Sequence, residues 1–177
     1  MFFKIGGQFF LCSIGRSGLI SDKKEGDGAT PIGEFPIREI FYRADRIDFS
    51  QSKISLPCIA LQENDCWCDD VNSKNYNKYI KSPSQESHEE LWREDDIYDV
   101  IVVIGYNDDP IKKGKGSAIF MHIARENYQP TAGCIALAKK DLLKIVPQLT
   151  PQTKIKIDAL GTIELIKNRA LEKESIF

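Results

Sequence analysis

A cysteine and a histidine twelve residues apart are the residues of this sequence that best suit catalysis. Cys134 closes the turn 131–134, and His122 follows an apolar run. The only other histidine, His88, lies in a polar, acidic stretch. A thiol becomes a nucleophile when a base takes its proton and backbone N–H groups face the oxygen that turns negative. The pair therefore predicts attack on an acyl carbon by Cys134, with His122 as the base.

The turn before Cys134 predicts help for this chemistry. Apolar residues recur at helical spacing within 135–149, so Cys134 is expected where a loop enters a helix, and a helix N-terminus favours a thiolate. Gly133 lets the backbone approach a substrate because glycine has no Cβ. A histidine on an apolar strand and a free cysteine are also common core residues. Residue types alone leave that second interpretation open.

Strands must position the pair. Val100–Ile104 is a continuous β-branched run and predicts a strand buried on both faces. The polar stretch 65–96 predicts a long surface excursion. Glycine turns and alternating apolar residues predict strands at 2–5, 8–14, 34–42, 53–61, 98–105, 117–123, 154–158 and 162–166. We expect a mainly β fold in which one main helix follows Cys134.

The length and composition predict one folded domain. The chain has 177 residues, 42% of them hydrophobic and 28% charged, which is ordinary for a globular protein. We assign residues 1–166 to the domain and 167–177 to a charged tail that forms a short, fraying helix. A net charge of -2 gives no basic surface for nucleic acid. No apolar stretch reaches the ~18 residues of a membrane span, and the first residues show no export signal.

Five cysteines leave at least one thiol unpaired within the chain. Cys12 and Cys58 lie in apolar runs that are typical of buried thiols. Cys66 and Cys68 flank Trp67 beside two aspartates, which raises the alternative of a zinc site. The paired ligand spacing of structural zinc sites is missing, so we expect neither a metal nor another cofactor.

Several segments resemble one known family. Residues 119–123 and 130–137 resemble the active-site signature of YkuD-type L,D-transpeptidases, in which a histidine precedes a Ser/Thr-x-Gly-Cys turn. Residues 25–33, 67–70 and 105–110 are similar to segments of one branch of that family. Together these matches span most of residues 15–140.

The resemblance implies a mainly β fold of two packed mixed sheets with one main helix after the cysteine. It implies that Cys134 attacks the L,D peptide bond after diaminopimelate in a tetrapeptide stem and expels D-alanine. The thioester then passes to an amine of a second stem. His122 is the implied base, and the N–H groups of Gly133 and Cys134, with Thr131, are the implied oxyanion hole.

The sequence also departs from the family pattern. Many members carry a histidine where this chain has Ala132 and an arginine where it has Ala136. We expect Arg125 or Arg16 to bind a stem carboxylate in their place, because a guanidinium matches that group. The other residues expected to line the substrate cleft are Trp67, Tyr106 and Asn107.

Three functions remain as alternatives. L,D-transpeptidation is favoured, an L,D-carboxypeptidase would hydrolyse the same bond, and a non-catalytic wall- or metal-binding module would do neither. We expect a monomer whose partners are peptidoglycan stem peptides. The chemistry favours the periplasm or cell envelope, whereas the missing export signal and the unpaired cysteines keep the cytoplasm as an alternative.

Overall fold

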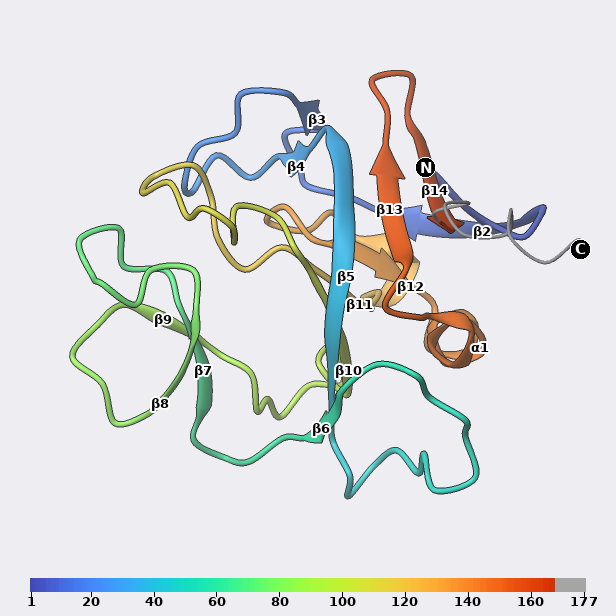
Figure 1. The fold of residues 1–177 in the computed structure, drawn as a ribbon, viewed down its shortest axis with the longest axis horizontal. Helices are drawn as coiled ribbons and strands as arrows, with labels where there is room; N and C mark the ends of the chain where they lie inside the picture. The colour runs from blue at the N-terminus through green and yellow to red at the C-terminus, as the bar shows by residue number, and fades with distance from the viewer. Residues whose placement is uncertain (168–177) are drawn as a thin grey trace, which may run out of the picture.

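Strands make up most of the regular structure in the computed structural model, which describes residues 1–167 (Figure 1). The strands are β1 (Phe2–Ile5), β2 (Gln8–Ser13), β3 (Leu19–Ile20), β4 (Thr30–Pro31), β5 (Gly33–Tyr42), β6 (Cys58–Ala60), β7 (Asp65–Cys68), β8 (Tyr79–Lys81), β9 (His88–Glu90), β10 (Val100–Ile104), β11 (Phe120–Ile123), β12 (Ile135–Leu137), β13 (Thr153–Ile157) and β14 (Thr162–Lys167). The helices are α1 (Lys139–Ile145) and the 3₁₀ turns η1 (Glu126–Tyr128) and η2 (Val146–Gln148). The predicted mainly β class is confirmed.

Nine strands form one sheet that closes on itself. Their order is β10-β11-β12-β2-β1-β14-β13-β5-β6, and β10 also pairs with β5. The extra pairing joins the first strand of the order to the eighth, so eight strands form a barrel-like ring and β6 adds to the outside of β5. A closed sheet has no free edge between its paired strands.

The expectation of two packed sheets is corrected by this closure. Residues 33–36 of β5 pair with β13, while residues 37–42 of the same strand pair with β10 or lie along it. In the same way, residues 8–11 of β2 pair with β1 and residues 12–13 pair with β12. Because β2 and β5 each pair with one set of strands at one end and with another set at the other end, the two expected sheets form one continuous sheet.

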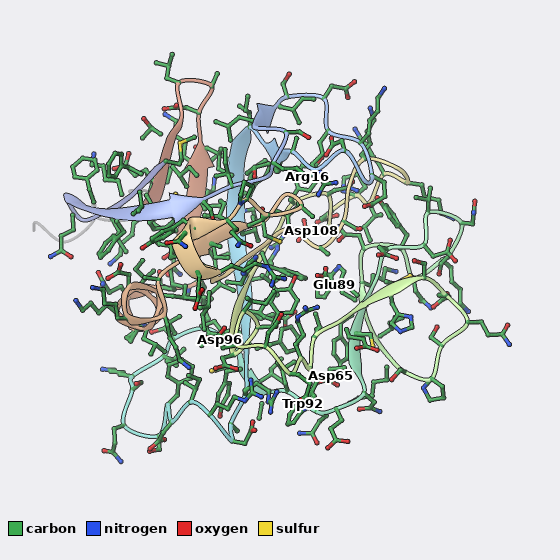
Figure 2. The ribbon with its side chains drawn as sticks, turned by 180° about the vertical axis from the view of Figure 1, so that it is seen from behind. Arg16, Asp65, Glu89, Trp92, Asp96 and Asp108 are labelled. Carbon is green, nitrogen blue, oxygen red and sulfur yellow. The ribbon has the colours of Figure 1, made fainter. Side chains whose placement is uncertain are left out.

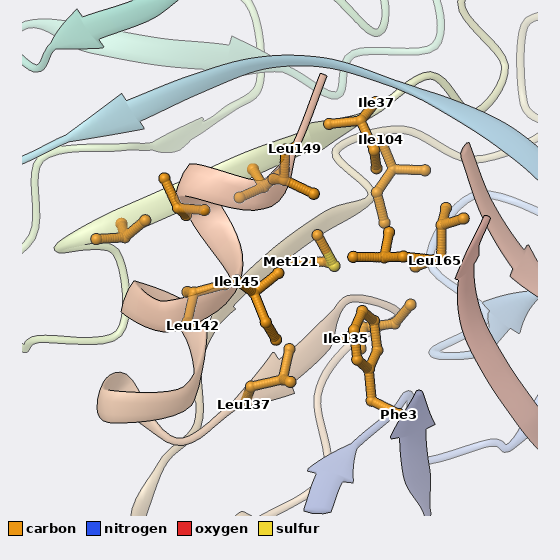
Figure 3. Close-up of a cluster of buried hydrophobic side chains, with 14 of the residues drawn as sticks. Phe3, Ile37, Ile104, Met121, Ile135, Leu137, Leu142, Ile145, Leu149 and Leu165 are labelled. Carbon is orange, nitrogen blue, oxygen red and sulfur yellow. The ribbon is translucent and has the colours of Figure 1, made fainter. Parts of the chain in front are cut away.

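The barrel interior and the inner face of α1 share one apolar core (Figure 3). Leu142 and Ile145 of α1 are fully buried against side chains from the ring, as is Leu149 beyond η2. Other buried members are Phe3, Ile37, Ile104, Met121, Ile135, Leu137 and Leu165. Burial of one such side chain stabilises a fold by roughly 1.5–3 kcal/mol, so this core holds the ring and the helix together.

The strand β10 separates two cores. Val100 and Val102 face the barrel interior, whereas Ile101 and Val103 join a second cluster outside the ring. All five residues of β10 are buried, so the predicted doubly covered strand is confirmed. The second cluster is covered by the excursion 65–96, which contains a three-stranded sheet in the order β8-β7-β9. Figure 1 shows this sheet on the opposite side of the molecule from α1.

The predicted helix 135–149 is shorter than expected. Its first three residues form β12, which lies between β11 and β2, and α1 begins only at Lys139. Pro147 then lies in η2. Ile135, Ala136 and Leu137 are all buried, so the strand hides three apolar side chains that a helix would have placed around its circumference.

Several other expectations concern the ends of the chain and its cysteines. The predicted tail begins at the last residue of β14, and its remainder lies outside the described residues. All five cysteines are free.

In residues 1–167, no helix is long and apolar enough to span a membrane. In the same part of the chain, no group of three or more histidine, cysteine or acidic side chains is placed to hold a metal ion.

Candidate active site

The parallel strands β11 and β12 place the two candidate catalytic residues on one face. His122 lies opposite Ala136 in the register of the pair. Side chains alternate along a strand, so Cys134, two residues before Ala136, points to the same face as His122. Met121 and Ile135 point the other way, into the barrel core. The strand register therefore explains how a spacing of twelve residues places a thiol and an imidazole on one face of the sheet.

That face opens into a cavity of about 530 Å³. Its walls come from the ring, from the loop after β2 and from the excursion 65–96. Figure 2 labels one residue from each of the last two walls, Arg16 and Glu89. Six of the nine residues expected at the site line this cavity: Cys134, His122, Thr131, Gly133, Arg16 and Arg125.

Cys134 is a buried, protonated thiol in the resting site. It is 7% exposed, its Sγ donates to the Ala118 carbonyl at 3.2 Å, and it accepts from the Phe120 N–H at 3.4 Å. Burial raises the pKa of the thiol to about 12, and the charge of Glu89 adds to the rise. The Phe120 N–H and Lys23 act in the opposite direction. If Cys134 is the nucleophile, as its sequence predicts, its proton leaves during attack rather than before it.

The prediction that Cys134 lies at the N-terminus of a helix is wrong. Cys134 immediately precedes β12, and the helix starts five residues later, at Lys139. The favourable dipole acts within the first turn of a helix. The reactivity of Cys134 must therefore come from its neighbours in the cavity.

His122 is prepared to act as a base. It is 5% exposed, and its Nδ1 lies 2.9 Å from the Ile123 carbonyl oxygen. A carbonyl can only accept, so Nδ1 carries the hydrogen and the lone pair of the neutral ring is on Nε2. The Tyr98 ring packs edge to face against the imidazole at 5.2 Å between centroids. Burial lowers the pKa of His122 to about 4, which keeps the ring neutral at physiological pH.

The lowered pKa of His122 predicts a loss of stability in acid. The unfolded chain takes up this proton near pH 6.5, whereas the folded protein takes it up only near pH 4. The free energy of unfolding should therefore fall as the pH drops through this window, by about 2 kcal/mol at pH 4.5 from this residue. Urea unfolding at pH 7.5 and pH 4.5 should show a smaller acid loss in His122→Gln than in the wild type. Equal losses in the two proteins would contradict the assignment.

Thr131 shapes the turn that carries Cys134. Its Oγ1 donates to the Cys134 carbonyl at 2.6 Å and accepts from the Gly133 N–H at 3.1 Å. Its backbone pairs with residues 14–16, which ties the turn to the end of β2. A Cβ at Gly133 would lie 2.9 Å from the Ala29 carbonyl oxygen, and φ there is 146°. Glycine at this position therefore permits both the backbone conformation and the close approach.

The remaining three expected residues lie away from the cavity lining. Trp67 and Tyr106 line a separate pocket of about 240 Å³. Asn107 holds its own loop by donating to the carbonyls of Lys112 and Gly116. Trp67 packs edge to face on Phe120 beneath the site.

These three residues meet at Asn77, which is 5% exposed. The Asn77 Oδ1 accepts from the Trp67 Nε1 at 2.9 Å and from the Ala118 N–H at 3.1 Å. Its Nδ2 donates to the carbonyls of Tyr106 and Asn107. Ala118 has φ 52°, an uncommon value for alanine, and its carbonyl accepts the bond from Cys134. Asn77 therefore fixes the backbone against which the thiol rests.

Lys23, Glu89 and Tyr98 are among the polar residues of the cavity that sequence reasoning missed. The hydroxyl of Tyr98 donates to the Glu89 carboxylate, whose pKa is raised by burial. Glu89 belongs to the polar excursion 65–96, whereas Tyr98 lies in the segment 98–105 that the sequence predicts as a strand. The sequence signal for Tyr98 was its position two residues before the buried strand β10.

Comparison with known proteins agrees with this geometry. The sequence model of the YkuD family, described as the L,D-transpeptidase catalytic domain, matches residues 2–157. No curated protein and no solved structure matches the chain significantly. The match covers every strand of the ring except β14, the whole excursion and both candidate catalytic residues. The chain therefore belongs to the YkuD family of L,D-transpeptidase catalytic domains.

Proposed function

We propose that this protein is a peptidoglycan L,D-transpeptidase with Cys134 as its nucleophile. The observation that carries the proposal is a cavity lined by both a buried thiol and an imidazole whose Nε2 lone pair is free to accept a proton. The proposed donor is a tetrapeptide stem, cleaved between diaminopimelate and D-alanine. The proposed place of action is the cell envelope, where such stems are found.

Each step of the proposed reaction uses a group of the site. Cys134 Sγ attacks the carbonyl carbon of the diaminopimelate residue while its proton moves to His122 Nε2. His122 then protonates the departing amine of D-alanine, which leaves a thioester. An amine of a second stem attacks the thioester, its proton passes to His122, and the thiol is restored.

The proposed oxyanion donors are the N–H groups of Gly133 and Cys134. In the resting site the Gly133 N–H donates to Thr131 Oγ1. Binding of the substrate carbonyl would exchange this bond for one to the developing oxyanion. Donors of this kind each lower the barrier by about 3–4 kcal/mol in enzymes that use them.

The charges around the cavity support a substrate with both an ammonium and a carboxylate. Arg16 and Arg125 are exposed on one part of the lining, and Asp69 and Glu89 come from the excursion. The free end of a diaminopimelate side chain carries both groups. We assign the carboxylate to the two arginines, because a guanidinium can hold it with two parallel hydrogen bonds.

Replacing both arginines should weaken donor binding with little change in the chemical step. The variant Arg16→Ala/Arg125→Ala is expected to raise KM for the tetrapeptide about tenfold, the effect of losing a charged hydrogen bond. Arg38→Ala is the matched control, since Arg38 is similarly exposed and paired with an aspartate but lies outside the cavity lining. Steady-state kinetics on a purified muropeptide would measure both. An unchanged KM would exclude the arginines from carboxylate binding.

The same muropeptides test the function itself. Incubation with tetrapeptide stems is expected to give cross-linked dimers and free D-alanine, separated by liquid chromatography and identified by mass spectrometry. Tripeptides without dimers would instead make water the acceptor and the protein an L,D-carboxypeptidase. Complete absence of both products would contradict the proposal.

A further inference from the structure

Lys23 is a buried lysine that the proposed reaction leaves unused. It is 4% exposed, and its Nζ lies 2.6 Å from Asp27 Oδ1. Asp27 is itself fixed, because it accepts from the backbone N–H groups of Lys24 at 2.8 Å and Ala29 at 2.9 Å. A buried ammonium is costly unless it is paired, so its place in the fold needs a reason.

The side chain of Lys23 passes Gly116 and reaches the turn that holds Gly133. A Cβ at Gly116 would lie 2.8 Å from the Cε of Lys23, so only glycine leaves room for the lysine stem. A Cβ at Gly133 would lie 3.6 Å from the Lys23 Nζ. The ammonium therefore lies against the residue next to Cys134, and Lys23 lines the same cavity.

The other basic residues of the cavity are less suited to act on the nucleophile. Arg16 and Arg125 are exposed to solvent, which screens their charge. Arg93 is half-buried and binds Asp95 with two hydrogen bonds. Among the described residues that line the cavity, Lys23 is the one buried cation.

The proposed chemistry creates negative charge where this cation lies. Attack by Cys134 moves charge from the sulfur to the carbonyl oxygen, at a thiol that is 7% exposed. The charge of Glu89 disfavours an anion on the sulfur, and the Tyr98 hydroxyl donates to Glu89. His122 becomes positive only after it has taken the proton. A cation that is already in place lowers the cost of forming the anion.

We propose that the Lys23 ammonium acts electrostatically on the turn that holds Cys134. It stabilises the negative charge that forms on the sulfur and on the attacked carbonyl oxygen. Asp27 then serves to hold the ammonium in place. This inference rests on the proposed role of Cys134 as the nucleophile. It assigns Lys23 an effect on thiol ionisation that can be measured without substrate.

Alkylation of Cys134 by iodoacetamide between pH 7 and pH 10 tests this role. The modified peptide is quantified by mass spectrometry, so the other four cysteines do not interfere. Lys23→Met should slow alkylation of Cys134 about tenfold at each pH, because loss of an opposite charge nearby raises a pKa by one unit or more. Lys24→Met, an exposed neighbour outside the cavity lining, is the control and should leave the rate unchanged.

Two further variants separate electrostatics from folding. Asp27→Asn keeps the cation and should alkylate at least as fast as the wild type. Lys23→Met/Asp27→Asn leaves no unpaired buried charge and should be as slow as Lys23→Met. If the pair is only structural, the double variant should recover the wild-type rate, and that result would overturn the inference. A wild-type protein that yields no muropeptide product would instead contradict the proposed function, whatever the alkylation rates show.

Discussion

Replacing Cys134 by serine is expected to abolish turnover and leave the fold intact. A hydroxyl can keep both hydrogen bonds of the thiol, to the Ala118 carbonyl and from the Phe120 N–H, so packing should hold. Serine is much less acidic than cysteine, and a neutral histidine with a pKa near 4 is too weak a base to activate it. We expect a fall of at least ~10³-fold, in line with the loss of a nucleophile from a catalytic unit. Release of D-alanine from purified muropeptides would measure it.

A second cysteine provides the control for this variant. Cys58→Ser changes a half-buried thiol in β6, away from the cavity lining, and should keep turnover near the wild-type rate. Incubation with a carbapenem should give a covalent adduct on Cys134 in the wild type and in Cys58→Ser, located by peptide mapping. Cys134→Ser should give none. Wild-type turnover by Cys134→Ser would remove the thiol from the mechanism.

Replacing His122 by glutamine is expected to lower kcat by ~10²- to 10⁴-fold, the usual contribution of a general base. The amide cannot accept the proton that Cys134 must lose. The wild-type rate should also fall below about pH 4, as His122 becomes protonated, because a charged imidazole has no lone pair at Nε2. The residual activity of the variant should lack this acid limb. Initial rates between pH 3.5 and pH 8 would test both statements.

The second histidine makes this test sharper. His88 also lines the cavity, and its Nδ1 lies 2.6 Å from the Glu86 carbonyl oxygen. His88→Gln is expected to retain most of the activity, because His88 stands on β9 of the excursion rather than on the strand beside Cys134. A larger loss in His88→Gln than in His122→Gln would reverse the assignment of the base.

The sequence predicted those parts of the site that depend on local pattern. The apolar run before His122 indicates a strand, and the turn at Gly133 indicates a close approach of the backbone. Their pairing follows once β11 and β12 lie parallel. The strand character of Ile135–Leu137 was missed, since a short apolar run fits a buried helix and a buried strand equally well. Only its neighbours β11 and β2 decide between the two.

Other parts of the fold and the site depend on contacts between segments that are distant in sequence. The pattern of apolar and polar residues along the chain does not indicate them. The sheet β8-β7-β9 forms in a polar stretch because its inner side chains cover the outer face of β10. The burial of Lys23 depends on the space left by Gly116, about 90 residues later. The closure of the ring depends on two strands that each pair with different neighbours along their length. In each case tertiary packing overrides local propensity.

The cavity walls come from separate parts of the chain, and this has a consequence for how specificity can diverge. The proposed catalytic pair lies on β11 and directly before β12, while Asp69 and Glu89 belong to the excursion between β6 and β10. A change in the length or charge of that excursion can alter which amine or stem is accepted without disturbing the thiol and imidazole. Exchange of residues 65–96 between related chains should therefore transfer substrate preference while conserving the reaction.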